Sequence, residues 1–209
     1  MLSSSKRFLF IHVPKTAGNS IQDALRDYSD DQIVARNQGQ DGIERFGVRS
    51  SRYDTKKHST LSDYERAYGK PMMAGLLKFS CVRNPWDRCM SHYFSPNMEE
   101  HHGGPIPWSK ERFLPWVRTV KPLAFYYSAG EKLQPIDVAA SNLDLIIRHE
   151  ALGSGFDAFC GKVGLPKLAL AHRNASRQKD QRKFYDAECV RLVRDLFAEE
   201  IEYFGYSFE

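Results

Sequence analysis

The architecture of this chain is set by the segment FIHVPKTAGNS, residues Phe10 to Ser20. The apolar run Lys6 to Val13 leads into it and predicts a buried strand. After a turn, apolar residues follow at i, i+3, i+4 and i+7, the spacing of an amphipathic helix: Ile21, Ala24, Leu25 and Tyr28. A strand, a turn and a helix therefore follow one another without a gap.

The turn in this segment has the chemistry of an anion site. The first N–H groups of a helix lack partners inside the helix, and its amino end is positive. Lys15 adds a cation, and Gly18 allows an anion to approach the backbone closely. Three further side chains offer hydrogen bonds: Thr16, Asn19 and Ser20. The pattern is not Walker A, because its lysine precedes the glycine, and an ordinary turn with a solvated lysine is the alternative.

A second segment of the same kind is KFSCVRNPWDRCMSHY, from Lys78 to Tyr93. The residues Gly75 to Val82 predict a buried strand. Asn84 then suits an N-cap, followed by a helix over Pro85 to Phe94. Arg83 stands at the junction, where a guanidinium can bind a phosphate through two parallel hydrogen bonds.

Several side chains of this second segment admit two interpretations. Ser91 lies about two turns into the helix, so spacing alone does not place it on the phosphate of Arg83. Arg83 can instead form a structural salt bridge. Arg88 fits a charge on the helix surface, and Trp86 fits the core better than a stack on adenine.

Weaker patterns complete the chain. Ser62 and Glu65 have capping-box spacing, which predicts a helix start, whereas residues 30–57 are polar and irregular. Leu143 to Ile147 predicts a third strand. Two later helices are indicated by apolar faces: Phe156, Phe159, Cys160 and Val163, then Cys189, Leu192, Val193, Leu196, Phe197 and Ile201. Alternating strands and helices predict one α/β domain over residues 1–209, whose mostly parallel sheet binds ligands at the carboxyl ends of its strands.

The composition, 42% apolar and 27% charged residues among 209, is that of a folded globular protein. Positive charge gathers in segments 45–57 and 173–183, which suits either a polyanionic ligand or a pair of solvated loops. The four cysteines have no metal-ligand spacing, and three lie in apolar patterns typical of buried thiols: Cys81, Cys160 and Cys189. No signal peptide and no membrane span of roughly 18 apolar residues is evident, so we expect a cytoplasmic protein.

The two phosphate-type segments, in this order, resemble those of the sulfotransferase family, specifically its Golgi-type carbohydrate branch and bacterial relatives. The tail from His172 to Phe208, with HRNAS, FYD and FGYSF, is similar to the same branch. The resemblance implies a P-loop-like, three-layer α/β fold and the donor 3′-phosphoadenosine 5′-phosphosulfate (PAPS). Asn19 departs from the family's more usual Thr or Ser. The membrane anchor of Golgi members is not evident, which favours a bacterial-type enzyme.

By position, the resemblance implies that two sets of residues bind the donor. The 5′-phosphosulfate would be bound by Lys15, Thr16, Ala17, Gly18, Asn19 and Ser20. The 3′-phosphate would be bound by Arg83 and Ser91, and Arg173, Asn174 and Ser176 would lie near the nucleotide. Lys15 is the candidate that stabilises charge on the departing phosphate, and positioning with charge stabilisation needs no metal.

The same resemblance favours His58 as the catalytic base, because it lies at a place comparable to the family's base histidine. Histidine also suits proton transfer at neutral pH. His12 fits a packed core position, and the remaining histidines are weaker candidates: His92, His101, His102, His149 and His172. An exposed loop residue is the alternative interpretation of His58.

Three other interpretations compete with a sulfotransferase. A kinase of the P-loop type would need Walker glycines and an acidic Mg²⁺ ligand, and neither is evident. A nucleic-acid-binding protein is suggested only by the two basic segments, without a recognisable motif. A degenerate glycan-binding relative is disfavoured because the chain keeps Lys15, His58, Arg83 and Ser91. A carbohydrate hydroxyl is the acceptor we expect, but the residues suit sugars, lipid-linked glycans and small alcohols equally well.

Overall fold

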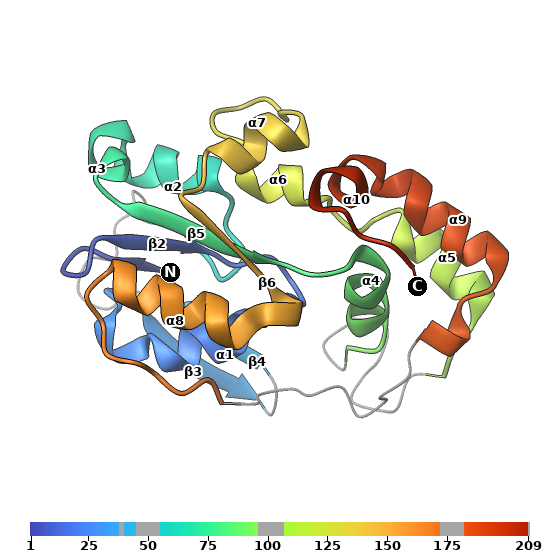
Figure 1. Cartoon of the computed structure of the whole chain (residues 1–209), viewed down its shortest axis with the longest axis horizontal. Helices are drawn as coiled ribbons and strands as arrows, with labels where there is room; N and C mark the ends of the chain where they lie inside the picture. Colours follow the sequence, from blue (N-terminus) through green and yellow to red (C-terminus); the bar gives the residue numbers. More distant parts are fainter. Residues whose placement is uncertain (38–39, 45–54, 96–106, 172–181, 209) are drawn as a thin grey trace.

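The computed structural model describes residues 1–37, 40–44, 55–95, 107–171 and 182–208, and these form a mixed α/β structure (Figure 1). The main sheet has the strand order β1–β2–β5–β6. Its strands are β1 Leu2–Ser3, β2 Phe8–Ile11, β5 Leu77–Val82 and β6 Leu145–Arg148. β5 pairs in parallel with β2 and β6, whereas β1 is antiparallel to β2. The sequence predicted a mostly parallel sheet from three apolar runs, and these form β2, β5 and β6. That prediction is confirmed.

Helices cover both faces of this sheet (Figure 1). Phe8 and Phe10 of β2 pack with α1 Gly18–Ala24 and α8 Leu152–Lys162. Leu9 and Ile11, on the alternate face, share a cluster with residues of five other helices. Those are α2 Leu61–Tyr68, α3 Lys70–Ala74, α6 Leu123–Tyr127, α7 Ile136–Ser141 and α10 Ala198–Phe204. The apolar alternation of one short strand thus divides the core between two helical layers.

A third apolar cluster lies beyond the end of β5 (Figure 1). It joins α4 Pro85–Tyr93, α5 Lys110–Val117 and α9 Ala187–Leu196. Trp86 is buried in this cluster, as expected. The last helix, predicted as continuous, is in fact broken at Phe197 and resumes as α10 Ala198–Phe204. The break lets the chain turn while Phe197 itself stays buried.

Arg88 is not the surface charge that its helix position suggested. Its side chain is 2% exposed and pairs with Glu200 at 2.7 Å, which is equally buried. The second carboxylate oxygen of Glu200 accepts the backbone N–H of Leu123 at 2.7 Å. The pair therefore connects α4 and α10 with the start of α6 through the interior.

Two other expectations were wrong. Within 30–57, a hairpin of β3 Gln32–Asn37 and β4 Gln40–Glu44 forms where an irregular segment was predicted. The capping box of α2 consists of Thr60 and Asp63, not of Ser62 and Glu65. Asp63 N–H donates to Thr60 Oγ1 at 3.1 Å, and Thr60 N–H donates to the Asp63 carboxylate at 2.9 Å. Thr60 has the extended backbone of an N-cap, whereas Ser62 already lies inside the helix.

Three short 3₁₀ turns complete the described elements: η1 Arg26–Tyr28, η4 His149–Ala151 and η5 Arg182–Phe184. All four cysteines are buried free thiols, which confirms the interpretation of their apolar surroundings. None of the helices in the described part of the chain combines the length and the apolarity that a bilayer crossing requires.

Candidate active site

The loop between β2 and α1 has an unusual backbone. Lys15 and Ala17 both adopt positive φ, 67° and 74°, a region that non-glycine residues rarely occupy. The Thr16 hydroxyl between them donates to the Val13 carbonyl at 2.9 Å and closes the turn. That proton is therefore engaged in shaping the loop, so Thr16 can offer a ligand its backbone N–H but not its hydroxyl proton. Strain of this kind is typical of functional loops.

Gly18 is required by packing as well as by its place in the loop. A Cβ atom at this position would lie 1.9 Å from Nε2 of His12, which no real side chain tolerates. The His12 ring is buried and stacks on Phe10 with ring centroids 5.6 Å apart. The prediction that His12 is a packed core histidine is confirmed, but its contact with Gly18 has no signal in the sequence.

Arg83 and Lys15 come together although they are 68 residues apart. The Arg83 guanidinium donates to the backbone carbonyl of Lys15 at 3.3 Å. The two residues meet because β2 and β5 are parallel neighbours, so that their carboxyl ends share one edge of the sheet. Arg83 forms no ion pair with any carboxylate in the described part of the chain. The salt-bridge interpretation of Arg83 therefore finds no support.

The Lys15 ammonium lies in a strongly cationic environment. Burial, together with the charges of Arg83 and Lys57, lowers the pKa of Lys15 to about 8. Its Nζ donates to Ser95 Oγ at 3.4 Å, a contact that the sequence gave no reason to expect. A bound anion would relieve the repulsion among these cations, so the cluster has the electrostatics of an anion site.

His58 is held in one tautomer. Its Nδ1 lies 2.9 Å from the backbone carbonyl of His12, and a carbonyl can only accept. Nδ1 therefore carries the proton, and Nε2 keeps a free lone pair. The pKa of His58 is lowered to about 4, mainly by burial; the hydrogen bond to His12 opposes the shift, and the charges of Lys57 and Lys15 add to it. The His58 residue is nevertheless exposed at the surface, as its alternative interpretation expected, so water moderates this shift. The imidazole is neutral at neutral pH in either case.

The remaining predicted residues are placed as follows. Ser91 is half-buried on α4, and no described contact joins it to Arg83. Ser20 is buried, and its N–H donates to the Ala17 carbonyl at 3.0 Å, while Asn19 is half-buried. Six residues named from the sequence lie outside the described part of the chain: His101, His102, His172, Arg173, Asn174 and Ser176.

His92 is a neighbour of the site that the sequence did not single out. Burial lowers the pKa of His92 to about 4, and the nearby charges of Lys15, Arg88 and His58 act in the same direction. Its ring meets Trp116 edge-on, with centroids 5.4 Å apart.

The start of α4 is anchored from three sides. Asn84 caps the helix as predicted, with Oδ1 accepting the N–H of Trp86 at 3.1 Å. Its Nδ2 donates to the Ser207 carbonyl at 2.7 Å, and its N–H donates to Glu150 at 2.9 Å. The residue after Arg83 is thus fixed both by Glu150 of η4 and by the C-terminal tail.

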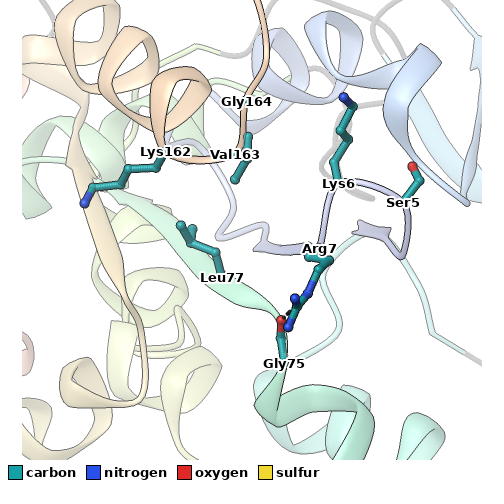
Figure 2. A pocket seen from close by; sticks show the side chains of 8 residues that line it. All are labelled: Ser5, Lys6, Arg7, Gly75, Leu77, Lys162, Val163 and Gly164. Atoms are coloured by element: carbon teal, nitrogen blue, oxygen red, sulfur yellow. Dashed lines mark hydrogen bonds between the residues drawn. The ribbon is translucent and has the colours of Figure 1, made fainter.

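A cavity of about 480 Å³ lies at the other end of the sheet (Figure 2). It is lined by the turn before β2, the start of β5 and the end of α8. Figure 2 shows Lys6 and Lys162 pointing away from each other, and Arg7 donating to the Gly75 carbonyl at 3.1 Å. These cations do not converge on one ligand, so the cluster around Lys15 and Arg83 remains the candidate site.

Comparison with known proteins identifies a family whose matched region contains the residues of this site. A family model described as the sulfotransferase family matches residues 1–118, which include the β2–α1 loop, His58 and the β5–α4 junction. Neither the curated proteins nor the solved structures contain a significant match. Since the matched span covers more than half of the 209 residues, the chain belongs to the sulfotransferase family.

Proposed function

We propose that this protein transfers a sulfuryl group from PAPS to a hydroxyl, with a carbohydrate as the expected acceptor. The observation that carries the proposal is the contact between Arg83 and the Lys15 carbonyl at 3.3 Å. It joins the two phosphate-type segments into one cationic cluster at the carboxyl edge of a parallel sheet. A donor with phosphates at both its 3′ and 5′ positions suits two such adjacent segments.

The donor is proposed to bind across both segments. Lys15, with the loop residues Thr16, Ala17, Gly18, Asn19 and Ser20, would hold the 5′-phosphosulfate. Arg83 and Ser91 would hold the 3′-phosphate, and Arg173 and Ser176 would lie near the nucleotide. We propose that residues 1–209 act as one domain with a P-loop-like arrangement. The two carboxylates that act on Arg83, those of Asp87 and Glu150, accept hydrogen bonds from other groups. The Arg83 guanidinium therefore remains available to a phosphate.

The chemistry divides between His58 and Lys15. Nε2 of His58 takes the proton of the acceptor hydroxyl, whose oxygen forms a bond to sulfur. The bond between sulfur and the bridging phosphate oxygen breaks, and the electron pair leaves with that oxygen. The Lys15 ammonium stabilises the negative charge that develops there. Positioning and charge stabilisation account for each step, so the proposal requires no metal.

The donor site is tested by calorimetric titration with 3′-phosphoadenosine 5′-phosphate (PAP), 5′-ADP and ATP. We expect PAP to bind at least about ten times more tightly than 5′-ADP, and Arg83→Ala to remove that preference, because a charge-assisted contact contributes about 1.5–3 kcal/mol. Arg191→Ala, which removes an exposed guanidinium from α9, is the matched control. Equal affinity for PAP and 5′-ADP in the wild-type protein would contradict the proposal.

The base is tested separately. His58→Ala should keep the PAP affinity of the wild-type protein but lower sulfuryl transfer by about 10²–10⁴-fold, because only proton transfer is lost. Transfer is measured with radiolabelled PAPS and a panel of glycan acceptors. If His58→Ala retains full turnover on an acceptor that the wild-type protein sulfates, another group is the base.

A further inference from the structure

Two acidic side chains lie near the proposed phosphate ligand Arg83. Asp87, in the first turn of α4, and Glu150, after β6, both act to raise the pKa of Arg83, although burial lowers it more. Glu150 also accepts the N–H of Asn84, the residue after Arg83. A carboxylate without another partner there would compete with a phosphate for the guanidinium and would repel the phosphate itself. The site therefore works only if both carboxylates are engaged elsewhere.

Glu150 is satisfied by neutral donors. One of its carboxylate oxygens accepts the N–H of Asn84 at 2.9 Å, and the other accepts the Tyr206 hydroxyl at 3.1 Å. These bonds hold Glu150 against the backbone at the start of α4. They also fix the orientation of the Glu150 carboxylate.

Asp87 is satisfied by a cation. Arg182 donates from Nε to one carboxylate oxygen at 2.9 Å and from a terminal nitrogen to the other at 3.0 Å. Its second terminal nitrogen donates to the Phe208 carbonyl, and the guanidinium lies 5.7 Å from the centre of the Phe208 ring. All three nitrogen atoms of Arg182 are therefore engaged within the protein. Such a bidentate ion pair neutralises the charge of Asp87 and fixes the position of its carboxylate.

We infer that Arg182 is a positioning residue of the 3′-phosphate site, which neutralises Asp87 and so leaves Arg83 available to the phosphate. The inference rests on the proposed donor. Arg182 contacts no substrate in this arrangement; it acts through Asp87. It also gives a role to one end of the basic segment 173–183, which the transfer chemistry does not use.

Four variants test this role: Arg182→Gln, Asp87→Asn, the double variant, and Lys183→Gln as the control that removes an exposed cation from the same 3₁₀ turn. Calorimetry gives their affinities for PAP and for 5′-ADP, which lacks the 3′-phosphate. We expect Arg182→Gln to weaken PAP binding about 10-fold, equivalent to about 1.4 kcal/mol, with 5′-ADP binding unchanged. Asp87→Asn should bind PAP at least as tightly as the wild-type protein, and the double variant should regain the wild-type affinity.

The alternatives give different patterns. If Arg182 only ties the C-terminal tail to α4, Asp87→Asn weakens PAP binding as much as Arg182→Gln does. If Arg182 contacts the phosphate directly, the double variant stays as weak as Arg182→Gln. Either pattern, or an Arg182→Gln protein with wild-type affinity, overturns the inference. Asp87→Asn keeps Arg182 in place, so it remains decisive if the arginine variant folds poorly. A wild-type protein without a preference for PAP over 5′-ADP fails the donor proposal itself, and the inference with it.

Discussion

His12 links the two chemical parts of the site through different atoms. Its backbone carbonyl holds Nδ1 of His58, and its ring lies against Gly18 in the phosphate loop. The rings of His12 and His58 also meet edge-on, with centroids 4.6 Å apart. The position of His58, the proposed base, relative to the β2–α1 loop is therefore set by one buried residue between them.

Gly18→Ala should abolish PAP binding, because the new methyl group would lie 1.9 Å from the His12 ring and displace the loop. Adding His12→Ala removes the obstruction and should restore binding to within about 10-fold of the wild-type protein, a coupling expected of residues in direct contact. Gly161→Ala in α8 is the control, because its Cβ would meet no atom within 4 Å. Titration with PAP measures all four proteins. A double variant as weak as Gly18→Ala alone would show that the glycine is needed for another reason.

Lys15 should make donor binding depend on pH. Burial, with the charges of Arg83 and Lys57, lowers its pKa to about 8, so the ammonium loses its proton as the pH rises through that value. The site then loses a cation, and PAP affinity should fall about 10-fold from pH 7 to pH 9. Lys15→Arg keeps its charge over this range and should bind PAP without the decline. A wild-type affinity that stays constant from pH 7 to pH 9 would contradict the assigned role.

Elements with a local signal were predictable, and those formed by distant contacts were not. β2 and β5 are short apolar runs, and Asn84 and Pro85 mark the start of α4, so each could be located from a few adjacent residues. The break between α9 and α10 has no such signal, because the apolar face continues through it. Phe197 leaves the helix to pack against the buried Arg88 guanidinium, 5.1 Å from its ring centre, and that partner is remote in sequence.

At the start of α2, the observed cap residue Thr60 and the predicted cap residue Ser62 should contribute differently to the free energy of unfolding. Thr60→Ala should lower the free energy of unfolding by about 1 kcal/mol, because Thr60 Oγ1 accepts the N–H of Asp63. Ser62→Ala should change stability little or raise it slightly, since residue 62 lies inside the helix, where alanine is favoured. Urea unfolding of both variants measures the difference. A larger loss for Ser62→Ala would contradict the observed cap.

The residues of the candidate site could be predicted from the sequence where they follow predictable strands, but their contacts with distant segments could not. Lys15 and Arg83 could be brought together from the sequence, because neighbouring parallel strands present their carboxyl ends at one edge. The bonds of His58 to His12, of Lys15 to Ser95 and of Arg182 to Asp87 could not. Each joins segments that only the complete fold brings into contact, and no spacing pattern accompanies them.

Breaking the buried pair of Arg88 and Glu200 should destabilise the whole molecule strongly. Arg88→Ala leaves an unpaired carboxylate in the interior and should cost about 3–5 kcal/mol of unfolding free energy. Replacing both partners with apolar residues, Arg88→Met with Glu200→Leu, should cost much less, because no charge is left without a partner. Urea denaturation of the two variants tests this. Equal losses would mean that the pair acts through packing and not through charge.

The parallel pairing of the sheet also governs how the site comes into existence. Phe10 lies opposite Phe79, and Phe79 opposite Leu145, so each strand pair closes a long loop of chain. Closing such loops costs entropy before any contact compensates for it, and it makes folding slow. Lys15 and Arg83 follow directly after β2 and β5 and meet only once those strands have paired. The proposed donor site should therefore form late in folding, together with the sheet, and we expect short fragments of the chain to lack it.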